Sequence, residues 1–192
     1  MSNTPENEVR TSSVLDPENL LTAQLQALER RRSSTRYIIV IAIALLAIVV
    51  LTCFVMSVVV IRGDTMSPNI YDGDSGLIWK LGSSYKHGDI VFYKTDAASG
   101  IQAARVIGIP GDQVDFSEKL HQIKINGTAI DEPYAYAQTN AADLTYPLVL
   151  EKGEYFLLGD NRPQALDSRF VSVGAVKSSD IVGKLIFLFR SY

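Results

Sequence analysis

Residues 62–74 read RGDTMSPNIYDGD, and they follow directly on Tyr37–Ile61, a run of 25 residues without a charge. The junction between these two segments decides the fold. An uncharged run of this length exceeds the ~20 residues that a helix needs to cross a bilayer. The sequence therefore predicts one N-terminal membrane-spanning helix over residues 37–61 and a separate domain that begins at Arg62.

A cleaved signal peptide is the competing interpretation of the apolar run. It fits poorly because 36 residues precede the run and no small-x-small cleavage site follows it. The charges that flank the run predict its orientation, since lysine and arginine favour the cytoplasmic side. Arginine occurs at positions 30, 31, 32 and 36 on one side and at position 62 on the other. We therefore expect a single-pass cell-membrane protein with residues 1–36 in the cytoplasm and residues 62–192 outside.

The cytoplasmic segment divides into two parts. Residues 1–15 are polar and without a periodic apolar face, so we expect them to be disordered. Asp16 can cap a helix with Pro17 at its first position. Leu21, Leu25 and Leu28 then follow at helical spacing, which predicts a short amphipathic helix to about residue 32. Its apolar stripe could rest on the membrane or on a partner, or the segment could be a weakly ordered tail.

Residues 62–192 have the pattern of an all-β extracytoplasmic domain. Short runs rich in Val, Ile, Tyr and Phe alternate with Gly, Pro, Asn and Asp turns. The adjacent Asn126 and Gly127 predict a tight hairpin, because both residues tolerate positive φ. The expected strands are Ser75–Trp79, Asp89–Tyr93, Gln102–Ile109, Gln113–Phe116, Gln122–Ile125, Tyr155–Leu158 and Ile181–Phe189.

Composition excludes several classes of function. The net charge of −3 argues against nucleic acid as a partner, since phosphate-binding domains are usually basic. The single cysteine, Cys53, excludes a disulfide within the chain. His87 and His121 are the only histidines and lack metal-ligand spacing, so we expect no metal and no cofactor.

Charged residues gather in one short stretch near the end of the domain. Asp160, Arg162, Asp167 and Arg169 fall within ten residues, directly after Gly159 and an apolar strand. This density predicts a paired network that holds a loop in place. Arg105, on a separate strand, is a plausible further member.

Four stretches resemble bacterial type I signal peptidase, a membrane-bound serine endopeptidase that removes signal peptides from exported proteins. Residues 63–68 (GDTMSP) are similar to the family's G-x-S-M-x-P, and residues 88–91 (GDIV) match its G-D-I-V strand. Residues 105–112 (RVIGIPGD) resemble K-R-V-I-G-L-P-G-D without the first residue. Residues 159–169 (GDNRPQALDSR) resemble G-D-N-R-x-x-S-x-D-S-R. The order and spacing of the stretches agree with the family over nearly all of the external domain.

The resemblance implies coiled antiparallel sheets and a Ser-Lys dyad. In such a dyad the serine attacks the carbonyl before the cut, and a buried lysine takes its proton. Lysine has a free pKa of about 10.4, so desolvation must lower that pKa by several units before it can act as a base at neutral pH.

The chain departs from the family at three positions. Thr65 stands at the nucleophile position, Ala104 at the lysine position, and Ala165 at the position of a serine that orients the lysine. Threonine keeps a hydroxyl but is hindered at χ1, and alanine accepts no proton. The rest of the motif set, which we expect to form the binding groove or to hold the fold, is retained: Gly63, Met66, Pro68, Arg105, Asp160, Asn161, Arg162, Asp167 and Arg169.

Two hypotheses follow from these departures. In the first, the protein is a non-catalytic member that binds an exported protein or peptide segment as a chaperone or assembly factor. The resemblance extends this role to the pilus-associated, signal-peptidase-like proteins of Gram-positive bacteria, with pilin and sortase as partners and the lipid bilayer as surroundings. In the second, the protein is an active signal peptidase that uses Thr65 as nucleophile with an unidentified base.

Overall fold

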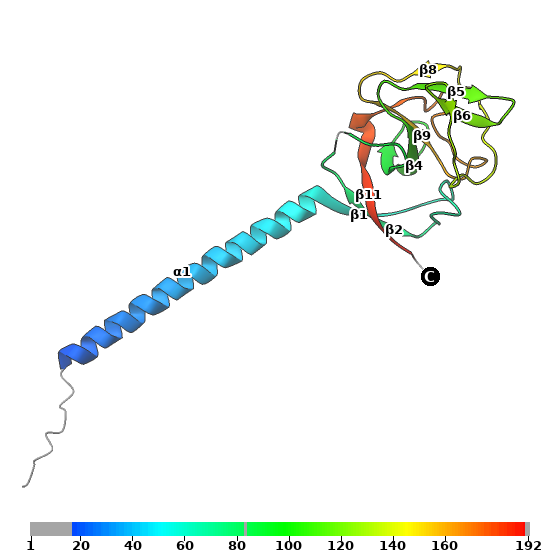
Figure 1. Ribbon diagram of the computed structural model, residues 1–192. Helices are drawn as coiled ribbons and strands as arrows, with labels where there is room; N and C mark the ends of the chain where they lie inside the picture. The colour runs from blue at the N-terminus through cyan, green and yellow to red at the C-terminus, as the bar shows by residue number, and fades with distance from the viewer. Residues whose placement is uncertain (1–16, 83, 191–192) are drawn as a thin grey trace, which may run out of the picture. The chain divides into compact units, whose positions relative to one another are not determined.

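The computed structural model describes residues 17–82 and 84–190, with side chains from residue 35 onward (Figure 1). The chain divides into two compact units between Val50 and Leu51. The predicted polar tail and the apolar stripe at Leu21, Leu25 and Leu28 lie outside the described residues and side chains.

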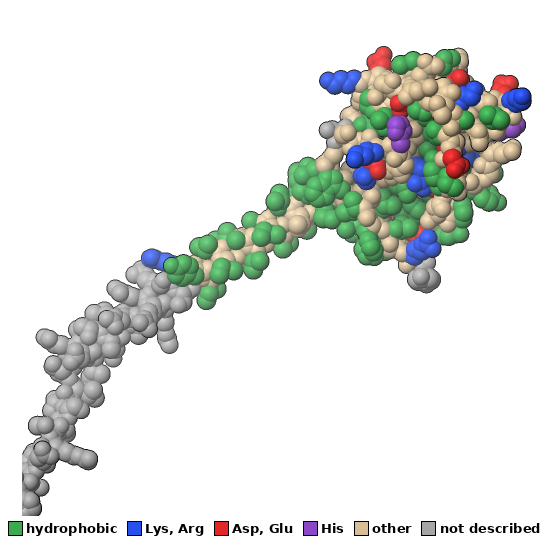
Figure 2. Space-filling model, in the orientation of Figure 1, with side chains coloured by type: hydrophobic (Ala, Val, Ile, Leu, Met, Phe, Trp, Pro, Cys, Tyr) green, Lys and Arg blue, Asp and Glu red, His purple; other side chains and the backbone are tan. Residues whose placement is uncertain are grey.

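Helix α1, Pro17–Val55, is longer than expected because its backbone is continuous through the predicted amphipathic segment and the uncharged run. Its segment Thr35–Val55 has 21 residues and a mean hydropathy of 3.4, long and apolar enough to cross a membrane. Figure 2 shows apolar side chains along this segment, whereas charged side chains dot the surface of the β domain.

The predicted helix end at Ile61 is wrong, because α1 ends at Val55 and strand β1, Met56–Val60, follows at once. The valines of β1 suit a strand that is exposed on one face, since β-branched side chains pack well on a pleated surface. β1 pairs along its whole length with β2, Ser75–Trp79, from Met56 opposite Trp79 to Val60 opposite Ser75. The end of the uncharged run therefore belongs to the β domain.

Antiparallel pairing organises the larger sheet, as the resemblance implied. Its seven strands lie in the order β1-β2-β11-β3-β4-β9-β10. Besides β1 and β2, the sheet contains β3 (Ile90–Lys94), β4 (Ile101–Gly108), β9 (Glu154–Leu158), β10 (Val176–Lys177) and β11 (Ile181–Phe189). A short 3-10 helix, η1, Ser178–Asp180, precedes β11. The expected strands are confirmed within one residue at each end, while β1 and the two-residue strand β10 were not expected.

A smaller sheet with the order β7-β6-β5-β8 completes the domain. Its strands are β5 (Gln113–Ser117), β6 (Gln122–Ile125), β7 (Thr128–Ala129) and β8 (Leu148–Val149). The hairpin predicted at Asn126 and Gly127 is confirmed: both residues have positive φ, 51° and 80°, between β6 and β7.

Strand β9 separates two parts of the apolar core. Its side chains alternate, so Tyr155 and Leu157 pack in one cluster while Phe156 and Leu158 pack in another. The first cluster contains Tyr93 and Ala104, and the second includes side chains from the smaller sheet. The C-terminal end of β9 lies within the core, and the Gly159 that follows it is buried as well.

Candidate functional site

Residues 64–70, which include Thr65, form a compact turn. The backbone NH of Ser67 donates to the carbonyl of Asp64 at 3.2 Å, and the NH of Ile70 donates to the carbonyl of Met66 at 3.0 Å. The side chains of Met66 and Ile70 are buried and anchor the turn to the core. Thr65 begins this turn and is half-buried.

Asn161 joins this turn to the stretch after β9. Its backbone NH donates to the carbonyl of Thr65 at 3.0 Å. Its side-chain amide donates to the carbonyl of Asp64 at 3.0 Å and to the hydroxyl of Ser67 at 2.9 Å. Asn161 is buried, and these three bonds, two from its side chain and one from its backbone, hold the Thr65 turn in place.

Gly159 brings together two of the three positions at which the chain departs from the family motifs, Thr65 and Ala165. A Cβ atom at Gly159 would lie 2.4 Å from Cβ of Ala165 and 2.6 Å from the carbonyl oxygen of Thr65. Strand β4 pairs with β9 so that Arg105 lies opposite Leu158. Ala104 precedes Arg105 on β4, and Gly159 follows Leu158, so both lie just beyond the last residues that pair these two strands. Thr65 and Ala165, far apart in sequence, therefore meet at Gly159, and Ala104 lies on the neighbouring strand.

The surroundings of Ala104 are apolar. Its side chain is 1 % exposed and packs in the cluster that includes Val91, Tyr93 and Val106. Ala165 is 4 % exposed. These two positions, where the resemblance expects a lysine and a serine, therefore supply methyl groups alone.

One histidine and one lysine of the β domain form ion pairs or hydrogen bonds with residues other than Thr65. His87 contacts the carboxylate of Asp112 at 2.7 Å, and Lys184 pairs with Asp89 at 2.7 Å. Within residues 17–82 and 84–190, no hydrogen bond joins the Thr65 hydroxyl to a lysine or a histidine.

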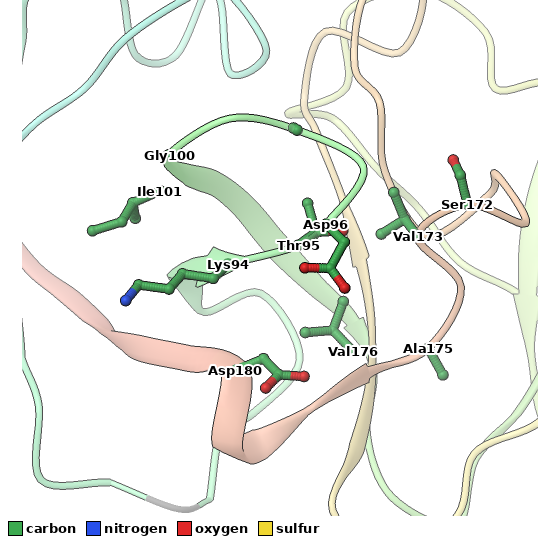
Figure 3. A pocket seen from close by; sticks show the side chains of 11 residues that line it. Lys94, Thr95, Asp96, Gly100, Ile101, Ser172, Val173, Ala175, Val176 and Asp180 are labelled. Atoms are coloured by element: carbon green, nitrogen blue, oxygen red, sulfur yellow. The ribbon is translucent and has the colours of Figure 1, made fainter.

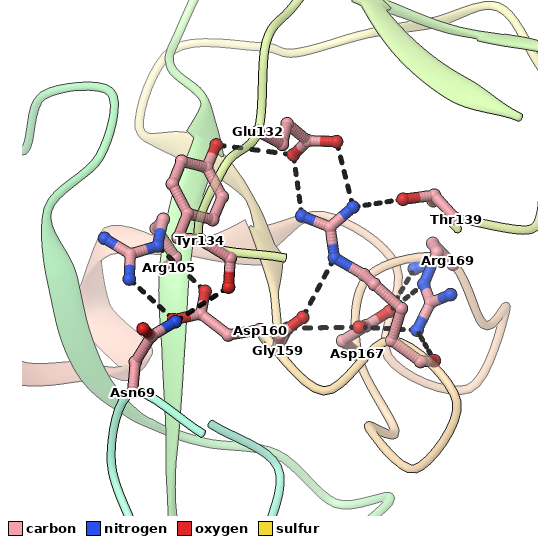
Figure 4. Close-up of polar contacts among 10 residues, drawn as sticks. Asn69, Arg105, Glu132, Tyr134, Thr139, Gly159, Asp160, Asp167 and Arg169 are labelled. Carbon is pink, nitrogen blue, oxygen red and sulfur yellow. Dashed lines mark hydrogen bonds and ion pairs between the residues drawn. The ribbon is translucent and has the colours of Figure 1, made fainter. Parts of the chain in front are cut away.

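A charged network surrounds the same glycine (Figure 4). Arg105 donates from Nε to Oδ1 of Asp160 at 2.8 Å and from Nη2 to Oδ2 at 2.6 Å. Asn69, from the turn after Thr65, donates to the same Oδ2 at 2.8 Å. The guanidinium of Arg105 also lies 4.2 Å from the ring centroid of Tyr134. Asp160 thus ties β4 to the Thr65 turn.

The other two arginines of the network are also paired and buried. Arg169 binds Asp167, with Nε 2.8 Å from Oδ1, as the sequence predicted. Arg162 donates instead to Glu132, with Nη2 2.6 Å from Oε1, and to the hydroxyl of Thr139. Sequence reasoning missed Glu132, Asn69 and Thr139 because each lies outside the charge-dense stretch and is brought to it by a loop.

Strand β4 offers a half-free edge beside these residues. Ile101–Arg105 pair with β3, whereas the pairing with β9 begins only at Arg105. On the β9 side, residues 101–104 therefore have no paired strand among the residues that the structure describes. Such an edge presents backbone NH and carbonyl groups that an extended chain could meet.

A cavity of about 530 Å³ lies at the Ile101 end of this strand (Figure 3). Asp96, from the loop after β3, and Asp180, from η1, project into it, with Ser172 and Val173 on a further loop. Thr65, Ala104 and Ala165 do not line it, so the cavity is separate from the residues around Gly159.

The fold and the motifs around Gly159 define the type I signal peptidase class. The chain belongs to this family: the model of the signal peptidase family, peptidase S26, matches residues 34–190. Signal peptidase IB of Staphylococcus aureus is 30 % identical over 179 residues, which cover 83 % of this chain and 91 % of that protein. Signal peptidase I of Bacillus licheniformis is 27 % identical over 171 residues, covering 83 % and 90 %. A crystal structure of a signal peptidase I from Enterococcus faecalis V583 aligns with a TM-score of 0.45 and 29 % identity, over 54 % of this chain and 97 % of that one.

Proposed function

We propose that this protein is a membrane-anchored member of the signal peptidase family that binds an extended segment of an exported protein without cutting it. One observation carries the proposal. Ala104 is 1 % exposed in an apolar cluster, at the position where the family motif has its lysine.

Attack on a peptide carbonyl by a hydroxyl requires a group that accepts the proton. A methyl group accepts none, and Ala165 adds none. In Ser-His-Asp peptidases, loss of one member lowers the rate on the order of 10⁴ to 10⁶-fold. By analogy, a chain with Thr65 as its sole remaining dyad member is too slow for routine secretion.

The residues that hold the turn of Thr65 next to strand β4 match the family motifs. The Asn161 and Asp160 bonds hold the Thr65 turn beside the half-free edge of β4 at residues 101–104. An extended peptide could add to that edge through main-chain hydrogen bonds, with its side chains in small pockets. The arginines at positions 30, 31, 32 and 36, which precede the apolar part of α1, favour a cytoplasmic N-terminus, which puts this edge on the outer side where exported chains emerge.

The bound segment belongs to a protein that has crossed the membrane. The resemblance to pilus-associated members suggests a pilin as that protein, with a sortase nearby. Cross-linking from a photoreactive residue at Gln102 in cells would test this: recovery of a pilin is expected, and recovery of exported proteins at large would restrict the proposal to a general chaperone.

The decisive experiment compares cleavage with binding in the full-length protein in detergent micelles. Signal-peptide substrate is incubated with the wild type and with Thr65→Ala, and both products and bound peptide are measured. We expect saturable binding by both proteins and no cleavage by either. Cleavage by the wild type that Thr65→Ala abolishes would overturn the proposal.

An active peptidase is the second candidate function, favoured by the hydroxyl that Thr65 keeps within an intact turn. A triple variant, Thr65→Ser, Ala104→Lys and Ala165→Ser, separates lost chemistry from a lost binding surface. We expect it to gain cleavage of the bound peptide, because the surrounding ion pairs are in place. Binding without gained cleavage would mean that the apolar pocket of Ala104 no longer accepts a lysine.

A further inference from the structure

The cavity at the Ile101 end of β4 adjoins the half-free edge of that strand. Ile101 is the first residue of the edge formed by residues 101–104, and it also lines the cavity (Figure 3). Gly100, from the turn between β3 and β4, lines the cavity as well. Each residue of a strand advances the chain by about 3.3 Å. A chain that pairs with β4 from Ala104 towards Ile101 therefore reaches the cavity after about three residues.

Apolar side chains form the inner wall of the cavity. Val176 is 5 % exposed and belongs to the core cluster that contains Ala104. Val173 packs against the same cluster. The aliphatic stem of a long side chain could pack on such a wall and leave a polar end group at the more exposed side.

Two carboxylates supply that more exposed side. Asp96 and Asp180 are exposed, and Figure 3 shows both pointing into the cavity. Asp180 accepts a hydrogen bond from the hydroxyl of Ser179 at 3.2 Å. Within residues 17–82 and 84–190, neither carboxylate forms an ion pair. Lys94 also lines the cavity, but its ammonium points away from both carboxylates.

A metal ion is a poor match for this charge. Across the part of the chain that the structure describes, no group of three or more His, Cys, Asp or Glu side chains could hold a metal. Two carboxylates beside an apolar wall suit an organic cation on a long apolar stem. Lysine and arginine side chains have that form.

We propose that this cavity holds a lysine or arginine side chain of the peptide bound along β4, with Asp96 and Asp180 as the partners of its charge. The inference rests on the proposed function and adds a basic residue to the description of the bound segment. Alternate side chains of an extended chain share a face. Since Val176 packs in the cluster of Ala104, the basic residue should lie about four residues from the one beside Ala104.

A peptide scan with the full-length protein in micelles tests the inference. One lysine is moved position by position through a fluorescent signal-peptide segment, a second set carries norleucine in its place, and binding is measured by anisotropy. We expect lysine at one position to bind about threefold to tenfold more tightly than norleucine, the range for one or two exposed ion pairs. Added salt should reduce this preference.

A double-mutant cycle assigns the preference to the cavity. Replacing both carboxylates, Asp96→Asn with Asp180→Asn, should abolish the preference for lysine and leave binding of the norleucine peptide unchanged. Glu118→Gln with Glu151→Gln is the matched control, because it removes the same charge from two exposed side chains that do not line the cavity. This control should keep the preference. If the double variant at the cavity does not fold, Asp96→Asn alone gives the same test with a smaller expected loss.

The outcomes separate this inference from the proposed function. Equal affinities of the lysine and norleucine peptides at every position would overturn the role of the cavity. A lysine preference that survives the loss of both carboxylates would overturn it as well, and in either case peptide binding itself would stand. Absence of binding by the wild type would instead overturn the proposed function, and this inference with it.

Discussion

Arg105 and Asp160 form a two-point ion pair, with Nε to Oδ1 at 2.8 Å and Nη2 to Oδ2 at 2.6 Å. The Asp160 side chain is fully buried and that of Arg105 is 13 % exposed. The pair also holds Asn69 of the Thr65 turn. The geometry of the turn therefore depends on an ion pair that solvent scarcely reaches.

Asp160→Asn should lower the free energy of unfolding by about 3–5 kcal/mol, because it leaves the Arg105 charge without its partner in a desolvated place. Urea denaturation of the full chain measures this. Lys184→Gln is the control, since its pair with Asp89 is 40 % exposed on the lysine side and should contribute less than about 1 kcal/mol. Similar losses of unfolding free energy in Asp160→Asn and Lys184→Gln would contradict the importance assigned to the ion pair of Arg105 and Asp160.

Gly159→Ala should destabilise the protein and disturb the Thr65 turn. The added methyl would lie 2.6 Å from the Thr65 carbonyl oxygen and 2.4 Å from Cβ of Ala165, an overpacking that costs about 1–3 kcal/mol. Thermal denaturation and peptide binding both report on the change. Gly82→Ala is the matched control, because its nearest contacts would lie at 3.9 and 4.0 Å.

A double variant sharpens this prediction. Adding Ala165→Gly to Gly159→Ala removes one close contact and leaves the one with Thr65. We expect stability to recover in part while peptide binding remains weakened. Full recovery of both would show that Thr65 shifts without consequence.

Asp112 should make stability depend on pH in acid. Burial raises its pKa, but hydrogen bonds from the Ile109 backbone NH, His87 and Asn126 outweigh burial, so the pKa lies below the ordinary 3.8. A carboxylate with a lowered folded pKa contributes stability above its unfolded pKa and loses it as the pH falls through the folded value. The stability advantage of the wild type over Asp112→Asn should therefore be full at pH 5 to 7 and shrink below pH 3.8. An advantage that stays constant to pH 2 would contradict this assignment.

Ala104→Lys should give a protein whose stability rises with pH. The apolar cluster around Ala104 disfavours the ammonium, so the folded lysine pKa falls below its unfolded value of about 10.4. Between those two values the unfolded chain binds more protons, so stability increases with pH. We expect a gain of about 3 kcal/mol from pH 7 to pH 10, measured by denaturant titration. Ile101→Lys, at a position 36 % exposed on the same strand, should lack this dependence.

Local patterns predicted much of the fold because they depend on neighbouring residues. The length of the uncharged run predicted the apolar helix. The alternation of short apolar runs with turn residues predicted the longer strands, including both ends of β11. The two-residue strands β8 and β10 were not predicted, since so short a pairing leaves no periodic signal, whereas the hairpin at Asn126 and Gly127 indicated where β7 begins. The valines of β1 were assigned to the helix because apolar composition alone does not separate a membrane helix from a strand.

The sequence by itself determined the family, the positions of Thr65, Ala104 and Ala165 in its motifs, and the pairing of Asp167 with Arg169, which lie two residues apart. Tertiary structure alone decided that Thr65 and Ala165 meet at Gly159, that Glu132 pairs with Arg162, and that Asn69 joins the pair of Arg105 and Asp160. The physical reason is that each of these contacts joins chain segments far apart in sequence. Their distances depend on strand register and on close packing, neither of which a local pattern of residues encodes.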